Sequence, residues 1–158
     1  MFLWKRFFVI LVIAFSLYSC GEKKDLLLNF DAKTTFVNSY KFTNGIDYSN
    51  AEKYLEINSI DIDPNLVFEK INLSKKYNKY YVYVELNVPS ETIFKIYYTT
   101  NGGDFNEQNT LRQPVKQGNN KFKLISTDTN FDGGLRLDPG EVPGKYTIKR
   151  FSVYGLEK

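Results

Sequence analysis

The chain has 158 residues, with 21 Lys and Arg against 18 Asp and Glu, one Cys and no His. The missing histidine excludes Ser-His-Asp and Cys-His triads and the histidine-bearing zinc sites. The formal charge of +3 gives no electrostatic argument for nucleic acid as a partner, which needs a clustered basic face. Carboxylate chemistry, a lysine or tyrosine base, or no catalysis at all remains.

The first 19 residues predict a signal peptide, because Lys5 and Arg6 precede an apolar run over 7–17. A membrane-spanning helix needs about 20 apolar residues, and this run is shorter. The sequence Leu17-Tyr18-Ser19-Cys20 resembles the lipobox of bacterial lipoproteins, with Tyr18 where that family usually has a small residue. The resemblance implies covalent lipid such as palmitate on Cys20, holding the protein on the inner or outer membrane of a bacterial cell envelope. The alternative is an ordinary signal peptide that ends near a cysteine.

We therefore expect a signal peptide over 1–19, a lipidated cysteine and short tether over 20–25, and a single domain over 26–158. In that domain apolar residues repeat with a period of two, which predicts strands. The clearest strand is Tyr80 to Val88, and further strands are expected over 29–42, 54–62, 66–73, 92–100, 121–125, 134–138 and 145–154. In the last one the apolar positions change phase, which predicts a bulge near Lys149 and Arg150. Short strands divided by turn signals predict an all-β fold, a two-sheet antiparallel β-sandwich of the jelly-roll type.

Outward-facing tyrosines are the predicted ligand-binding residues. Strand alternation places Tyr81, Tyr83 and Tyr97 on outer faces, with Glu85 and Asn87 beside the first two. An exposed ring can stack on the apolar face of a sugar while polar side chains bind its hydroxyl groups. The alternative is that these tyrosines are good strand formers that cover a second packed layer.

The segment Leu135-Arg136-Leu137-Asp138-Pro139-Gly140, followed by Val142-Pro143-Gly144 and Tyr146-Thr147-Ile148, carries a second resemblance. It is similar to a module in the jelly-roll domains of bacterial envelope and polysaccharide-assembly proteins. The resemblance covers roughly 54–154 and implies a carbohydrate-binding-like sandwich. Arg136 and Asp138 share one face of their strand, so they are expected either to form an ion pair or, for Arg136, to contact a ligand.

A turn-like segment supplies a candidate metal site. Asp128, Asn130 and Asp132, followed by Gly133, match the first half of a calcium-binding loop. Pro139 stands where the bidentate glutamate of such a loop is needed, so an Asp- and Asn-rich turn explains the same pattern.

A carboxylate pair, Asp61 and Asp63, would lie about 7 Å apart on one strand face, a spacing compatible with glycoside hydrolysis. Asp63 precedes Pro64, however, and such residues commonly accept backbone hydrogen bonds in turns. We therefore expect no enzymatic activity and no cofactor apart from the lipid. The sequence favours a lipoprotein that binds an envelope glycan or polysaccharide. The alternative is a non-enzymatic structural or protein-partner-binding lipoprotein of the envelope.

Overall fold

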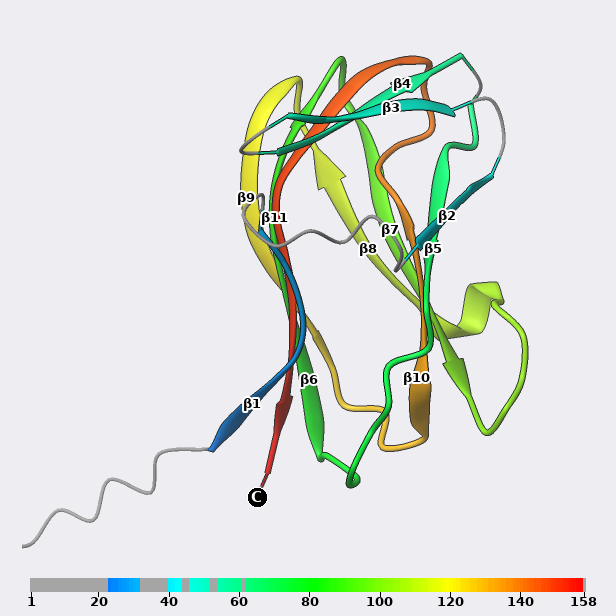
Figure 1. Cartoon of the computed structure of the whole chain (residues 1–158), viewed down its shortest axis with the longest axis vertical. Coiled ribbons are helices and arrows are strands. Elements are labelled where there is room, and N and C mark those ends of the chain that lie inside the picture. The colour runs from blue at the N-terminus through cyan, green and yellow to red at the C-terminus, as the bar shows by residue number, and fades with distance from the viewer. Residues whose placement is uncertain (1–22, 32–39, 44–45, 52–53, 61, 158) are drawn as a thin grey trace, which may run out of the picture.

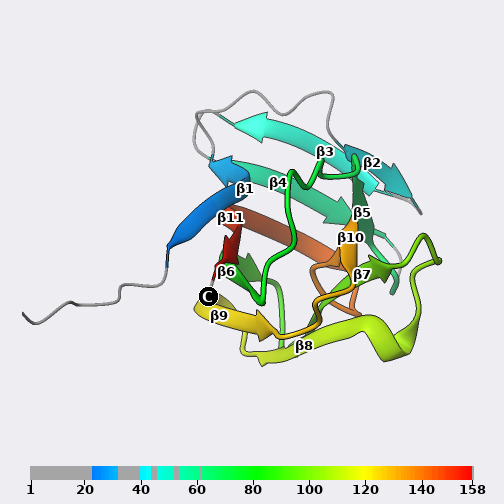
Figure 2. The ribbon, with the colours of Figure 1, turned by 90° about the horizontal axis from the view of Figure 1, so that it is seen from below.

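The computed structural model describes residues 23–31, 40–43, 46–51, 54–60 and 62–157 (Figure 1). Cys20 and the expected signal peptide lie outside the described residues. The strands form two antiparallel sheets that pack face to face (Figures 1 and 2). This arrangement confirms the predicted two-sheet jelly roll. Within the described part of the chain, no helix has the length and apolar character to cross a bilayer.

The six-stranded sheet has the order β3 (Ile46–Ala51), β4 (Tyr54–Ser59), β11 (Gly144–Leu156), β6 (Lys79–Val88) and β9 (Gly118–Ser126). Its remaining strand, β1 (Lys24–Asp31), pairs with β11 over Arg150 to Leu156, whereas β4 pairs with β11 over Gly144 to Ile148. The five-stranded sheet has the order β2 (Tyr40–Thr43), β5 (Asn65–Phe68), β10 (Phe131–Asp138), β7 (Thr92–Thr100) and β8 (Thr110–Val115). A short 3-10 helix, η1 (Glu107–Asn109), precedes β8.

The hydrophobic core lies between the sheets. Phe68 of the five-stranded sheet stacks on Phe151 of the six-stranded sheet with ring centroids 5.2 Å apart, and Phe94 meets Phe122 edge to face at the same distance. Fully burying such a side chain contributes about 1.5–3 kcal/mol. The core therefore joins the two sheets.

Strand β6 shows why the sequence pattern was informative. Every second residue from Tyr80 to Val88 is at most 3% exposed, and the residues between them are only partly buried. Successive side chains of a strand point to opposite faces. The predicted outward row of β6 is thus confirmed, and it lies on the outer face of the six-stranded sheet.

The predicted bulge in β11 is also confirmed. The register between β11 and β6 shifts between Ile148 and Arg150, so Lys149 is the extra residue. Without the bulge, strict alternation would point Arg150 into the core with Ile148. With it, Phe151 points inward and is buried, whereas Arg150 stays on the outer face opposite Glu85.

Several expected strand bounds differ from the structure. The single strand expected over 29–42 corresponds to the end of β1 and most of β2, which belong to different sheets. Strand β1 begins at Lys24, inside the expected tether. Strands β3 and β8 were not expected. In β8, Pro114 interrupts the alternating pattern that would have predicted a strand. Proline is tolerated there because β8 is an edge strand.

Candidate functional site

The predicted ligand-binding residues divide between the two outer faces of the sandwich. Tyr81, Tyr83, Glu85 and Asn87 lie on the outer face of the six-stranded sheet, and Tyr97 and Arg136 lie on that of the five-stranded sheet. The core separates these two faces. The six residues therefore do not form one site.

On the outer face of the six-stranded sheet, the tyrosines of β6 lie between the outward-facing rows of its two neighbours, β11 and β9. Tyr81 is opposite Tyr154 of β11, and Tyr83 is opposite Ser152. On the other side, β9 places Lys123 opposite Tyr83 and Ile125 opposite Tyr81. The predicted tyrosines are thus part of a continuous face that a ligand can reach.

Cationic side chains lie over both rings. The Arg150 guanidinium carbon is 4.7 Å from the centroid of the Tyr83 ring, and the Lys123 Nζ is 4.3 Å from that of Tyr81. Lys121 and Lys24 contact the same two rings at 5.5 Å and 5.6 Å. Cation–π contacts at exposed positions contribute about 0.5–1 kcal/mol each. They hold the rings in place and bring positive charge over the ring faces.

A groove of about 530 Å³ opens further along the same face, where Asn87 and Tyr54 contribute to its lining. Asn119 joins two of its polar side chains, because its Oδ1 accepts hydrogen bonds from Asn87 Nδ2 at 3.3 Å and from Lys149 Nζ at 2.8 Å. Asn87 is four residues from Tyr83 along β6, which corresponds to roughly 13 Å. An extended chain-like ligand can therefore contact the tyrosines and the groove together.

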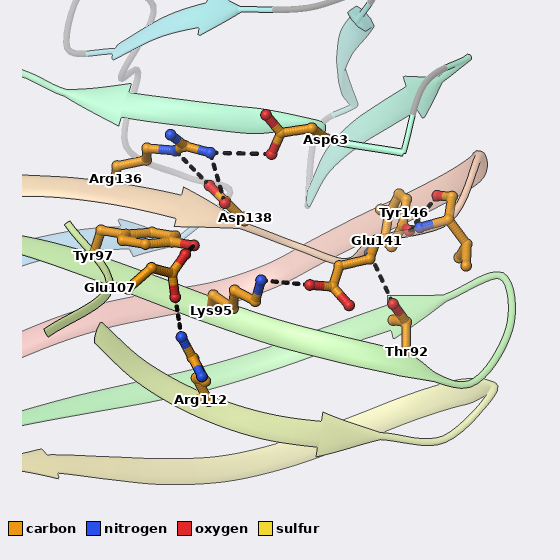
Figure 3. Close-up of polar contacts among 11 residues, drawn as sticks. Asp63, Thr92, Lys95, Tyr97, Glu107, Arg112, Arg136, Asp138, Glu141 and Tyr146 are labelled. Atoms are coloured by element: carbon orange, nitrogen blue, oxygen red, sulfur yellow. Dashed lines mark hydrogen bonds and ion pairs between the residues drawn. The ribbon is translucent and has the colours of Figure 1, made fainter. Parts of the chain in front are cut away.

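The outer face of the five-stranded sheet carries a polar network instead (Figure 3). Arg136 Nε and Nη2 each donate to the Asp138 carboxylate at 2.8 Å, and Nη2 also donates to Asp63 at 3.1 Å. The guanidinium lies 4.9 Å from the centroid of the Tyr97 ring. The predicted ion pair between Arg136 and Asp138 is therefore confirmed.

The polar groups of this network satisfy one another. Tyr97 Oη donates to Glu107 at 2.7 Å, and Glu107 pairs with Arg112 (Figure 3). Burial and the hydrogen bond to Glu107 raise the pKa of Tyr97. The Tyr97 residue is only 7% exposed, so its ring is not an open platform for a sugar. A ligand-binding role for Tyr97 and Arg136 stays a prediction, and their observed contacts are structural.

Asp138 is the most buried charge of the network, at 3% exposure. Burial raises its pKa from the ordinary 3.8 to about 6, although the two hydrogen bonds from Arg136 favour the carboxylate. Arg136 thus favours the ionised form of a carboxylate that burial disfavours.

The three residues of the candidate calcium loop are engaged in turn contacts. Asp128 Oδ1 accepts from the backbone N–H of Asn130 at 2.8 Å, and Asp132 Oδ2 accepts from that of Gly102 at 2.5 Å. Asp132 also accepts from the Thr99 hydroxyl, so it holds the turn between β7 and β8. Among the described residues, no group of three or more Asp, Glu, His or Cys side chains is arranged to hold a metal ion. Calcium binding stays a prediction that these contacts do not support.

Only one residue of the carboxylate pair Asp61 and Asp63 can be placed in the structure. Asp61 lies outside the described residues, and Asp63 pairs with Arg136. The cations over the tyrosines were not predicted from the sequence. Alternation in β9 would have placed Lys121 and Lys123 on one face, but only the strand pairing shows that this face is the one that carries Tyr81 and Tyr83.

The fold is similar to that of carbohydrate-binding modules of known structure. The CBM22-1 xylan-binding domain of Xyn10C from Paenibacillus barcinonensis has a TM-score of 0.57 and 10% identity, over 87% of this chain and 99% of that domain. For the low-affinity xylan-binding module CBM86 from Roseburia intestinalis, the TM-score is 0.53 and the identity 13%, over 85% of this chain and 96% of the module.

A third example is CBM6cm-2 from Cellvibrio mixtus lichenase 5A, solved in complex with cellotriose. It has a TM-score of 0.54 and 9% identity, over 82% of this chain and 97% of that module. No family model and no curated protein matches the sequence. At these identities the likeness shows a shared β-sandwich fold.

Proposed function

We propose that the sandwich is a non-catalytic saccharide-binding domain and that it binds on the outer face of the six-stranded sheet. The observation that carries the proposal is the row of Tyr81, Tyr83, Glu85 and Asn87, which runs into a polar groove. Rings beside amide and carboxylate groups match the apolar faces and hydroxyl groups of sugars. A xylan-binding domain and a module solved in complex with cellotriose have a similar fold, which supports the same ligand class.

We further propose that lipid on Cys20 anchors the protein to a membrane of a bacterial cell envelope. The support is the lipobox-like sequence Leu17-Tyr18-Ser19-Cys20. Strand β1 begins at Lys24, whose ammonium group lies over the Tyr81 ring. Four residues span at most about 14 Å, so the anchored cysteine would stay close to the end of the sheet that carries Tyr81.

Mass spectrometry of the protein purified from membranes tests the lipid anchor. A lipid-modified N-terminal Cys20 is expected, and an unmodified cysteine or a chain that begins elsewhere would refute the anchor.

Calorimetric titration of the detergent-purified protein with neutral and acidic oligosaccharides tests the binding proposal. We expect at least one saccharide to bind, and Tyr83→Ala to weaken its affinity about tenfold or more, which corresponds to about 1.4 kcal/mol. Arg112→Ala, on the opposite outer face, serves as the control and should leave the affinity unchanged. Loss of binding in Arg112→Ala but not in Tyr83→Ala would move the site to the five-stranded sheet. Absence of binding by every saccharide would reject the proposal in favour of a protein partner.

A further inference from the structure

The outer face of the six-stranded sheet carries more cations than carboxylates. Its described side chains include seven cations and two carboxylates, namely Lys24, Lys79, Lys121, Lys123, Lys145, Lys149 and Arg150 against Glu56 and Glu85. Glu85 already pairs with Lys121 at 3.1 Å, and Glu56 with Lys145 at 2.5 Å. Four more of these cations contact tyrosine rings, the Asn119 amide and the Tyr154 hydroxyl, namely Lys24, Lys123, Lys149 and Arg150.

This excess belongs to one face and not to the whole protein. The chain as a whole has 21 cationic and 18 acidic side chains. On the outer face of the five-stranded sheet, Lys95, Arg112 and Arg136 each pair with a carboxylate. Among the described side chains, the cations on the outer face of the five-stranded sheet are thus paired with carboxylates, whereas those on the outer face of the six-stranded sheet outnumber the carboxylates.

The position of the cations over the rings indicates what kind of sugar would bind. A sugar that stacks on Tyr81 or Tyr83 must displace the cation that covers that ring, which costs about 0.5–1 kcal/mol for each contact. A neutral sugar offers the displaced cation only uncharged hydroxyl groups as acceptors. An anionic substituent on the sugar can accept a charge-assisted hydrogen bond from the displaced ammonium or guanidinium group, and such bonds are about twice as strong as neutral ones.

We propose, building on the saccharide-binding function above, that this face recognises an acidic saccharide whose sugars carry carboxylate or sulfate groups. The rings of Tyr81 and Tyr83 contact the sugar planes. Lys123 and Arg150, moved to the ring edges, and Lys149, at the groove, bind the anionic groups. Because these positions are spread along β6 and its neighbours, the ligand is a chain with repeated charges and not a single acidic sugar.

The test compares oligosaccharides of equal length in titrations of the detergent-purified full-length protein. The probes are a neutral xylo-oligosaccharide, an oligogalacturonate that carries carboxylates and a sulfated oligosaccharide, with inorganic polyphosphate as a polyanion without sugar rings. We expect one or both acidic oligosaccharides to bind at least about tenfold more tightly than the neutral one, and this preference to shrink as salt screens the charges. The stronger of the two identifies the anionic group.

Variants separate charge recognition from sugar stacking. Lys123→Gln with Lys149→Gln should reduce the preference for the acidic over the neutral oligosaccharide about tenfold. The matched control, Lys76→Gln with Lys116→Gln, removes two exposed lysines from loops and should leave the affinity unchanged. Circular dichroism shows that the variants are folded.

The outcomes distinguish this inference from the proposed function. Equal affinity for neutral and acidic saccharides, still dependent on Tyr83, would overturn the inference and keep the saccharide-binding function. Polyphosphate binding as tight as that of the acidic saccharides and insensitive to Tyr83→Ala would also overturn it, because charge alone would then explain the binding. Absence of binding by all three saccharides would overturn both proposals.

Discussion

The buried ion pair between Arg136 and Asp138 gives the sharpest test of the network on the five-stranded sheet. Arg136→Met keeps the apolar stem but removes both hydrogen bonds to a carboxylate that is 3% exposed. Removing one partner of a buried pair typically costs about 3–5 kcal/mol, because a buried charge is left uncompensated. We therefore expect Arg136→Met to lower the free energy of unfolding by about that amount at pH 7.

The pH dependence of this loss has a definite sign. The pKa of Asp138 is about 6 in the folded protein and ordinarily 3.8, so the folded state binds this proton more tightly than the unfolded chain. Its contribution to stability is therefore fully present below pH 4 and is lost as the pH rises through about 6; a shift of about 2 units corresponds to about 3 kcal/mol. Without Arg136 the folded pKa should rise further. The loss caused by Arg136→Met should hence shrink at pH 5, where Asp138 is protonated.

Urea unfolding measures these differences. Arg112→Met provides a matched control, because Arg112 pairs with Glu107 while both side chains are about half exposed, and such surface pairs contribute at most about 1 kcal/mol. Adding Asp138→Asn to Arg136→Met should recover much of the lost stability, which a double-mutant cycle would show as a coupling energy above about 1 kcal/mol. A loss in Arg136→Met no larger than in Arg112→Met, or one unchanged between pH 7 and pH 5, would refute the reasoning.

Four further substitutions test the packing by urea unfolding. Gly133→Ala should cost about 2 kcal/mol or more, because Gly133 has a φ of 104° and a Cβ there would lie 2.1 Å from a backbone carbonyl oxygen; Gly118→Ala, with a φ of 92° but open space, should cost clearly less. Tyr146→Phe should cost about 1–2 kcal/mol, since its hydroxyl donates to a backbone carbonyl at 2.5 Å. Phe151→Ala should cost about 3–5 kcal/mol, because this ring is 1% exposed between the sheets. Equal losses for the two glycine variants, or losses below about 0.5 kcal/mol for the other two, would contradict these assignments.

The sequence was sufficient to predict features that depend only on residues close together in the chain. The alternation of β6 distinguishes inward from outward residues, and the bulge in β11 follows because Ile148 and Phe151 must both point inward. Pairing between strands is not local. Tyr81 and Tyr97 look equivalent as outward tyrosines, but β6 and β7 belong to different sheets, so one ring is partly exposed and the other is covered by Arg136.

The candidate site likewise combines residues that could be predicted from the sequence with residues that only strand pairing brings together. Asn87 could be assigned to an outer face from sequence, whereas its neighbours in the groove come from β4, β9 and β11. Likewise, Lys123 lies 42 residues from Tyr81 in the chain, and only the register of β9 on β6 brings them together. Composition did not reveal the cationic face, because the charges of the whole chain nearly balance.

The two outer faces should respond in opposite ways to the loss of a cation. On the five-stranded sheet, Arg136 compensates a buried carboxylate, so its removal should reduce stability and leave saccharide affinity unchanged. On the six-stranded sheet, Lys123 lies over an accessible ring and compensates no buried charge, so its removal should reduce affinity for an acidic saccharide and leave the free energy of unfolding within about 0.5 kcal/mol of the original. If Arg136→Met weakened binding as much as Lys123→Gln while the protein remained folded, the assignment of one face to stability and the other to recognition would be wrong.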